Sequence, residues 1–339
     1  MLKQVLSQTE CQPGAPAACS FGAVVIGRNE GDRLKACIAS LSGVLVVYVD
    51  SGSTDDSVQA ARLAGADVIE LDLSIPFTAA RARNKGFSRL QEIAADIPFV
   101  LFVDGDCEII RAWPAEALRF LDSRPDVAAV FGQLRERYPE KSVYNWLCDQ
   151  EWNRPVGEAR AFAGNVMVRA SALASVGGYR EDVIAAEEDE LCVRLRAANW
   201  RIWRIAGEMG FHDAAIGQFG QWWRRSLRAG YAFAQGADLH GEPPELHFVW
   251  ERNRSLIWGI FLPAGCLMAG FAFPPWGHAF WLVYLVQLVR QTVRQTGSVT
   301  DRLTLSFFQL LARFPESWGV LKFARDRLFS RRSRIIEYK

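Results

Sequence analysis

The sequence feature that most constrains the fold is an apolar run that ends in acidic side chains. Residues 99–103 read Phe-Val-Leu-Phe-Val, and Asp104-Gly105-Asp106 follows directly. Such a run is typical of a strand buried on both faces, as in a parallel sheet covered by helices. Open α/β folds bind ligands at the carboxyl ends of these strands, where two aspartates can share one hard divalent cation. The same residues also suit a solvated turn, since Asp and Gly are common in turns.

Apolar runs alternate with helix-periodic segments through the first hundred residues. The expected strands cover residues 23–27, 44–49, 68–71 and 99–103, and the expected helices cover residues 32–41, 53–64 and 78–94. Strands and helices that alternate at this spacing form parallel βαβ units. Ser53 and Asp56 have capping-box spacing, which places the start of the second helix there. This half contains no G-x-G-x-x-G or G-x-x-x-x-G-K-[ST] sequence, so neither a dinucleotide fold nor a P-loop is predicted.

The next part of the chain combines a predicted strand, a glycine turn and an acidic helix start. Residues 162–168 read as a strand in which Gly164 permits a close approach, and Gly177-Gly178-Tyr179 reads as a turn. The acids from Glu187 to Glu190 open an amphipathic helix. Acids at a helix start complement its dipole, but a run of four exceeds what capping needs, so one is a candidate general base. His212 is a candidate ligand, although a lone histidine is more often structural.

Two apolar segments set the last hundred residues apart. Residues 255–273 and 276–289 contain no charged side chain, and Pro274-Pro275 lies between them. The first segment is just long enough to cross a bilayer, whereas the second is marginal. Arginines flank the pair at positions Arg252, Arg254, Arg290 and Arg294. We expect a membrane hairpin with both ends on the cytoplasmic side; the alternative is a buried helical pair in a dimer interface.

The charge distribution and the cysteine content indicate which binding partners and which cellular compartment to expect. From residue 290 onward the chain carries 11 basic and 4 acidic side chains, a net charge of +7, which leaves −6 for residues 1–289. A basic end beside apolar segments favours anionic lipid over nucleic acid, and residues 303–323 are expected on the membrane surface. The 7 cysteines form no C-x-x-C pair, which fits a reducing compartment without a disulfide framework or zinc site. Residues 1–20 show no secretory signal and read as a loose leader.

Taken in order, segments between about residues 20 and 235 resemble the family 2 glycosyltransferases, which are inverting enzymes with a GT-A fold. The matching segments are Val24-Val25-Ile26-Gly27-Arg28-Asn29-Glu30, Val49-Asp50-Ser51-Gly52-Ser53-Thr54-Asp55, Arg83-Asn84-Lys85-Gly86, Asp104-Gly105-Asp106, Gly164-Asn165, Val176-Gly177-Gly178-Tyr179, Ala186 to Leu195, and Gln221-Trp222-Trp223-Arg224. Some positions depart from the family's pattern. Ser51 replaces its second Asp, Glu188 its catalytic Asp, and Arg225 the final Trp of its polymerising members.

The resemblance implies an α/β fold of GT-A type with a mostly parallel sheet flanked by helices, followed by an apolar and amphipathic helical region. Residues 21–240 are then the glycosyltransferase domain. Its nucleotide-sugar half is 21–110 and its acceptor half is 111–240, and residues 241–339 form a membrane-associated region with a basic tail.

The resemblance also implies roles for individual residues. The candidate general base is Glu188, with Asp189 as the alternative one position away. The candidate ligands for Mg²⁺ or Mn²⁺ are Asp104, Asp106 and His212. The candidate nucleotide-sugar residues are Asn29, Glu30, Asp50, Arg81, Asn84, Lys85 and Asp104, with Asp50 toward the base and Arg81 or Lys85 toward the phosphates. The candidate acceptor-side residues are Gly164, Asn165, Glu187, Trp222, Trp223 and Arg224.

The implied reaction moves a sugar from a nucleotide-sugar, a UDP-sugar in the first instance, to a hydroxyl of a saccharide or lipid-linked saccharide. It would take place at the cytoplasmic face of the cell membrane, in polysaccharide assembly. A polyprenyl-phosphate sugar synthase of the same fold would instead use a lipid phosphate as the acceptor. A sugar-phosphate nucleotidyltransferase usually has a glycine-rich first loop, unlike Arg28-Asn29-Glu30. A non-catalytic membrane scaffold would have no need to keep Asp104, Asp106 and Glu188 together.

Overall fold

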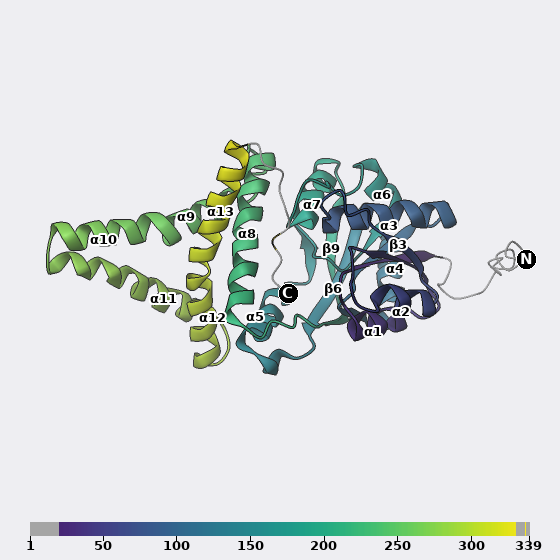
Figure 1. The fold of residues 1–339 in the computed structure, drawn as a ribbon, viewed down its shortest axis with the longest axis horizontal. Helices are drawn as coiled ribbons and strands as arrows, with labels where there is room; N and C mark the ends of the chain where they lie inside the picture. Colours follow the sequence, from purple (N-terminus) through teal and green to yellow (C-terminus); the bar gives the residue numbers. More distant parts are fainter. Residues whose placement is uncertain (1–19, 330–335, 337–339) are drawn as a thin grey trace, which may run out of the picture. The chain divides into compact units, whose positions relative to one another are not determined.

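The computed structural model describes residues 20–329 and residue 336, and the expected leader lies outside them except for Ser20. The chain forms two compact units (Figure 1). Unit 1 comprises residues 1–138, 149–181 and 188–214, and unit 2 comprises residues 139–148, 182–187 and 215–339. Each unit is described by itself below.

Unit 1 is built on a mixed sheet, which has nine strands within the described residues and the order β3-β2-β1-β4-β8-β6-β9-β5, with β7 paired to β9. The strands are β1 (Phe21–Gly27), β2 (Leu45–Asp50), β3 (Asp67–Glu70), β4 (Phe99–Asp104), β5 (Cys107–Ile109), β6 (Val127–Glu136), β7 (Gly157–Ala159), β8 (Val166–Arg169) and β9 (Arg201–His212). The strands β3, β2, β1 and β4 are parallel, as the βαβ pattern predicts. Beyond β4 the sheet becomes mixed, because β8 runs antiparallel to both β4 and β6.

The helices of unit 1 follow the strands closely. They are α1 (Asp32–Ser40), α2 (Ser57–Leu63), α3 (Ala79–Ile93), α4 (Trp113–Ser123), α6 (Ala170–Ser175) and α7 (Glu187–Ala197), the last beginning at the boundary between the units. α3 packs on β1 and β2 at short range. A Cβ on Gly86 would come within 2.2 Å of a Val24 methyl group, so glycine at this position allows the approach. Thr78, the first residue of the expected helix, is the N-cap of α3, since its Oγ1 accepts a hydrogen bond from the Arg81 backbone N–H.

Two predicted boundaries in unit 1 are wrong. α2 begins at Ser57 rather than at Ser53, because the Ser53 hydroxyl donates to the Asp50 carboxylate and accepts from the Asn29 N–H. The predicted strand 162–168 begins only at Val166. Residues 162–165 form a loop, and Gly164 of this loop lies against Asp104.

Unit 2 is mainly helical. Its elements are η1 (Pro139–Lys141), the first part of α5 (Val143–Trp152), α8 (Phe219–His240), α9 (Val249–Leu256), a π-helical turn η2 (Ile257–Phe261), α10 (Leu262–Ala272), η3 (Trp276–Trp281), α11 (Leu282–Arg294), α12 (Val299–Leu311) and α13 (Arg313–Leu328). α8 and α13 pack together through glycines, because a Cβ on Gly230 would lie 1.9 Å from the Glu316 carbonyl oxygen and one on Gly319 would lie 2.1 Å from that of Leu227. α8 therefore belongs to unit 2. The glycosyltransferase domain expected at residues 21–240 stays a prediction.

The expected apolar hairpin is formed by α9 to α11 within unit 2 (Figure 1). Among the described residues, Val249–Ala272 is the one helix long and apolar enough to cross a membrane, and 17% of its apolar window is buried. The second apolar segment starts with the 3₁₀ turn η3 before α11, so it does not form one long helix. Large apolar side chains near the turn are exposed, including Phe271 at 86% and Trp276 at 81%.

Candidate functional site

The parallel strands bring their acidic ends to one edge of the sheet. Asp104 ends β4 in register with Ile26 of β1, and Asp50 ends β2 in register with Gly27. The Gly105 N–H donates to the Ile26 carbonyl, which fixes the turn between Asp104 and Asp106. These residues do form a turn, but the turn is hydrogen-bonded to the sheet and Asp106 is only 8% exposed, so it is not the solvated turn of the alternative interpretation.

Arg83 on α3 joins two of the candidate carboxylates. Its side chain is 2% exposed, and its Nη2 lies 2.9 Å from Asp104 Oδ1 and 2.9 Å from Glu188 Oε1. The guanidinium carbon also lies 5.4 Å from the centroid of the Tyr179 ring. A buried cation between two carboxylates holds both in position and offsets their mutual repulsion.

Gly164 and Asn165 both contact Asp104. A Cβ on Gly164 would come within 2.2 Å of Asp104 Oδ2 and 2.9 Å of Arg83 Nη2, so a larger residue there would displace both groups. The Asn165 side-chain oxygen Oδ1 accepts from the Asp104 N–H at 3.1 Å, and its Nδ2 donates to Cys107 Sγ at 3.2 Å. Both residues therefore support the acidic turn, and the acceptor-side role remains a prediction for them.

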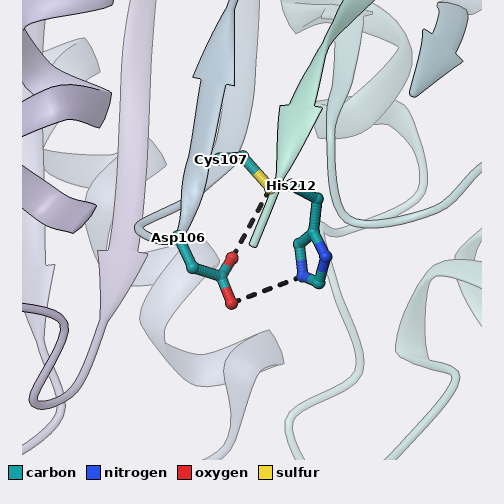
Figure 2. Close-up of side chains that lie close together, drawn as sticks. All are labelled: Asp106, Cys107 and His212. Carbon is teal, nitrogen blue, oxygen red and sulfur yellow. Dashed lines mark hydrogen bonds and ion pairs between the residues drawn. The ribbon is translucent and has the colours of Figure 1, made fainter. Parts of the chain in front are cut away.

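Asp106 meets His212 across the sheet, because β5 pairs with β9 and sets Cys107 opposite His212. Asp106 Oδ2 lies 3.3 Å from His212 Nε2, and the Cys107 thiol donates to Asp106 Oδ1 at 3.5 Å (Figure 2). The ligand atoms of these three residues all lie within 4.8 Å of one another. Glu136 flanks the same histidine, with its Oε2 3.5 Å from Nδ1, and the ring of Trp152 contacts the imidazole edge-to-face at a centroid distance of 4.6 Å.

This donor set fits a hard divalent cation better than a soft one. Carboxylate oxygen suits Mg²⁺ and Mn²⁺, and the imidazole of His212 adds a nitrogen ligand beside Asp106. Burial, and then the charge of Asp106, raises the pKa of the Cys107 thiol well above its usual range. Cys107 therefore remains a neutral thiol that donates to Asp106 instead of a thiolate that would attract a soft metal.

The loop after β2 is organised by Asp50, whose side chain is buried. Its Oδ2 accepts from the N–H groups of Gly52 and Ser53 at 2.9 and 2.8 Å, and its Oδ1 accepts from the Tyr48 and Ser53 hydroxyls. Burial, followed by the Asp50 charge, raises the Tyr48 pKa. Asn29, which has a positive φ of 56°, ties the loop after β1 to this loop by accepting from the Thr54 N–H at 2.7 Å. The nucleotide roles of Asp50 and Asn29 remain predictions.

The other candidate nucleotide residues differ in how their side chains are used. Arg81 is buried, and it donates to the carbonyl oxygens of Ile75 and Asp72 at 2.8 and 2.7 Å. Asn84 holds the turn at Tyr179, since it donates to the Tyr179 carbonyl and accepts from the Tyr179 N–H, both at 2.8 Å. Lys85 is exposed, and Glu30 pairs with Arg33 at 2.8 Å. Of the two predicted phosphate ligands, Lys85 is therefore the more accessible.

The remaining candidates fall on α7 and α8. Glu188 and Asp189 are half-buried in the first turn of α7 in unit 1, and Glu187 precedes them as a buried residue of unit 2. In unit 2, Trp222 packs against Tyr144 and Phe308. In the same unit, Trp223 is half-buried and Arg224 is exposed.

Arg83 and Glu136 are among the residues of the site that were not predicted. Arg83 is the first residue of the Arg83-Asn84-Lys85-Gly86 segment that resembles the family. Gly86 of this segment lets α3 pack closely on β1, and a glycine at this position was the feature of the sequence that could have indicated a buried Arg83. Glu136 gave no local signal, because it reaches His212 only through the parallel pairing of β6 with β9.

The sequence of this region matches a known family. Residues 23–171 match Glycosyl transferase family 2. The Pre-mycofactocin glycosyltransferase of Mycobacterium tuberculosis is 28% identical over 206 residues, which is 56% of this chain and 42% of the relative. The match therefore spans less than half the length of that curated relative.

Two solved structures share the fold of this chain. The mannosyltransferase PcManGT from Pyrobaculum calidifontis, in complex with GDP-Man and Mn²⁺, matches 91% of this chain and 88% of its own, with a TM-score of 0.61 and 19% identity. S. aureus TarS 1-349 in complex with UDP-GlcNAc matches 92% of each chain, with a TM-score of 0.50 and 14% identity. These likenesses confirm the expected GT-A fold.

Proposed function

We propose that this chain is an inverting glycosyltransferase that moves a sugar from a nucleotide-sugar to an acceptor hydroxyl. The observation that carries the proposal is the link from Asp104 through Arg83 to Glu188 at the carboxyl edge of a family 2 sheet. It unites a carboxylate of the predicted metal motif with the predicted base in one buried network. The complex of PcManGT with GDP-Man and Mn²⁺ supports the same class of donor and ion.

The predicted cation is Mg²⁺ or Mn²⁺. Asp106 and His212 would hold it, with Asp104 on the side of the donor. When bound, a divalent cation supplies Lewis-acid stabilisation of the diphosphate leaving group. The chain's own contribution is to fix the ligands, because Cys107 and Asn165 orient the turn that carries Asp106, and Glu136 flanks the ring of His212.

Glu188 is the proposed general base. Its carboxylate is 13% exposed and points toward Arg83, which also contacts Asp104. A positioned carboxylate that accepts the proton of the attacking hydroxyl contributes about 10²–10⁴-fold to the rate. Asp189, one position along the same helix, remains the alternative. The substitution Glu188→Gln keeps the shape and removes the basicity, so kcat should fall while donor affinity holds.

The proposed acceptor is a lipid-linked saccharide, and the proposed location is the cytoplasmic face of the cell membrane. This proposal is supported by the exposed apolar side chains of α10 to α11 and by the basic end of the chain. About 1 kcal/mol of attraction to anionic lipid is expected for each well-placed Lys or Arg. A polyprenyl-phosphate acceptor would need no base to deprotonate it, so full activity of Glu188→Gln would favour that alternative.

A donor screen tests the function. The detergent-purified full chain would be incubated with a panel of nucleotide-sugars, with Mn²⁺ or with EDTA, and release of the nucleoside diphosphate would be measured. We expect metal-dependent release with one nucleotide class and its loss in Asp106→Asn. Asp126→Asn is the matched control, because Asp126 is exposed and pairs with Arg124 and Arg201. Equal release of the nucleoside diphosphate with Mn²⁺ and with EDTA would overturn the metal-dependent mechanism.

A further inference from the structure

A polar cavity lies within unit 2, at the base of the apolar hairpin. It has a volume of about 180 Å³, and its lining comes from α9, η2, α11, α12 and α13. The lining side chains include two arginines, three glutamines and one tryptophan: Arg254, Arg313, Gln287, Gln291, Gln309 and Trp258. A single water needs only about 10–15 Å³ of such space, so the cavity has room for a polyatomic ion.

The lining of the cavity is polar, whereas the helices next to it expose apolar side chains. The two legs of the hairpin leave the cavity with exposed apolar side chains, such as Phe261 on one leg and Leu285 on the other. Yet the cavity itself presents guanidinium and amide groups. Two of its buried polar atoms, Arg254 Nε and Gln291 Oε1, have no hydrogen-bond partner among the described residues. Buried polar atoms are normally paired. The Arg254 Nε–H is a donor, so it indicates a site that an acceptor such as an anion oxygen completes, whereas Gln291 Oε1 is an acceptor and would need a donor such as water.

The charge of the cavity is positive. Arg313 pairs with Glu316 at 2.6 Å, and the Ser255 hydroxyl donates to the same carboxylate oxygen. Arg254 forms no ion pair within residues 20–329 and 336. Burial, and to a smaller extent the charge of Arg254, lowers the Arg313 pKa. Within the described part of the chain, the lining itself therefore holds two guanidiniums and no carboxylate, although Glu316 and Glu251 act on Arg313 from outside it. An anion in the cavity would give Arg254 a partner.

We propose that this cavity binds a phosphoryl group, with Arg254 and Arg313 as its cationic ligands and the glutamine amides as further donors. A membrane lipid headgroup is the source that the structure favours, because apolar legs that can lie along a hydrocarbon chain leave the same cavity. Arginine suits this ligand, since its planar fork matches phosphate oxygens. The lipid source rests on the membrane attachment proposed above, whereas the phosphoryl site itself does not.

Vesicle binding tests the headgroup. The full chain would be mixed with phosphatidylcholine vesicles that carry either phosphatidate, a phosphomonoester, or phosphatidylglycerol, a phosphodiester, at equal measured surface potential. We expect the wild type to prefer phosphatidate and Arg254→Gln to lose about tenfold or more of that preference, as for a lost charge-assisted hydrogen bond. Arg290→Gln is the matched control. Arg290 is exposed on α11 and does not line the cavity, so its loss should weaken binding to both lipids equally.

A second arm separates the sources of the phosphoryl group. In detergent micelles, inorganic phosphate or pyrophosphate should raise the melting temperature of the wild type but not that of Arg254→Gln. Gln291→Leu, which removes one amide from the lining without removing charge, should weaken the same response. If free phosphate stabilises the chain and phosphatidate is not preferred, the ligand is a soluble anion and the lipid source is wrong.

The outcomes also separate this inference from the proposed function. Equal effects of Arg254→Gln and Arg290→Gln on lipid preference and on melting would overturn the phosphoryl site and leave only general surface charge. A wild type that binds no vesicle would overturn the membrane attachment, and the micelle arm would still judge the cavity. Donor hydrolysis in the same samples reports on the catalytic site separately.

Discussion

Glu136 Oε2 lies 3.5 Å from His212 Nδ1, while Asp106 Oδ2 lies 3.3 Å from Nε2 of the same ring. The Glu136 side chain is fully buried and is itself fixed, because its carboxylate accepts from the N–H groups of Ala214 and Tyr138. The imidazole is therefore held between two carboxylates, one at the end of β6 and the other in the turn between β4 and β5. A carboxylate on the outer nitrogen of a histidine orients the ring and raises its basicity as a metal ligand.

Replacement of Glu136 by Gln should weaken metal binding without removing a ligand. The amide of glutamine is neutral and has one acceptor oxygen, whereas the carboxylate is charged and has two. The ring of His212 therefore loses its charged partner. Loss of such an outer partner typically lowers metal affinity by about 10–100-fold. Mn²⁺ titration of the purified chain, followed by calorimetry or electron paramagnetic resonance, measures this change.

A matched control exists on a neighbouring strand. Glu208 lies on β9, is 59% exposed and pairs only loosely with Arg135 at 4.0 Å. Glu208→Gln should leave the Mn²⁺ affinity unchanged. If Glu136→Gln behaves like this control while its circular dichroism and melting are those of the wild type, His212 is not a metal ligand positioned by Glu136.

Arg83 should be required for both stability and turnover. Arg83→Met removes the cation between Asp104 and Glu188 and leaves two carboxylates without it, which is expected to destabilise the fold by about 3–5 kcal/mol. Arg83→Lys keeps the charge but lacks the planar fork, so it should fold and lose more in kcat than in KM. Urea unfolding and steady-state kinetics measure the two effects. Arg89→Met is the control, because Arg89 is 38% exposed and such a surface ion pair contributes little to stability.

Gly164→Ala should disable donor binding while the sheet remains folded. The added Cβ would lie 2.2 Å from Asp104 Oδ2 and 2.9 Å from Arg83 Nη2, so one of these side chains must move. Both side chains belong to the proposed donor and metal site. The metal-dependent nucleotide affinity should therefore fall by about tenfold or more, which corresponds to a loss of about 1.4 kcal/mol of binding free energy. Gly220→Ala serves as the control, since nothing lies within 4 Å of its Cβ position. Equal nucleotide affinities in the two variants would contradict the prediction.

The parallel half of the sheet was predictable because its signals are local. The apolar run that ends at Asp104 identifies β4, and Thr78 before a helical period identifies the start of α3. Register and direction in the second half depend on contacts between distant residues. Nothing in the residues 162–168 indicates that β8 enters antiparallel, or that Gly164 is taken out of the strand to face Asp104.

The parts of the site that escaped prediction depend on the same distant pairing. Glu136 and His212 are 76 residues apart and meet because β6 and β9 are in register at these two positions. The Asp50 carboxylate illustrates the converse case. Its place at the end of β2 was predictable, but its full set of hydrogen bonds with Tyr48, Gly52 and Ser53 was not. Sequence locates such residues at the edge of the sheet, and packing decides what they contact.

Ala186 offers a prediction on stability. Its φ is 56°, in the left-handed region, immediately before α7 begins at Glu187. This conformation costs an L-residue about 1–2 kcal/mol, and glycine adopts it freely but loses more entropy on folding. Ala186→Gly should therefore stabilise the chain by about 0.5–1 kcal/mol in denaturant unfolding. Ala185→Gly, next to it with no positive φ, should destabilise instead. A destabilised Ala186→Gly would show that the strain is not relieved by glycine.

The hairpin allows the membrane proposal to be tested without removing any helix. A chain cut at residue 252 would lose α13 and uncover the face of α8 that it covers, so its solubility would be hard to interpret. Point substitutions near the turn avoid this. Phe271 is 86% exposed and Trp276 is 81% exposed. Transfer of a large apolar side chain from water into lipid is favourable by about 1.5–3 kcal/mol.

We therefore expect Phe271→Ser and Trp276→Ser each to lower vesicle affinity by about tenfold or more, and the pair to lower it further. Leu63→Ser is the control, because Leu63 is 82% exposed on α2 in unit 1 and should not contribute. Sedimentation with vesicles measures affinity, and light scattering measures the mass of the detergent-free chain. A wild type that remains soluble as a dimer, and becomes a monomer in Phe271→Ser, would show that the apolar hairpin forms a dimer interface. In that case the glycosyltransferase site would remain and the membrane attachment would be wrong.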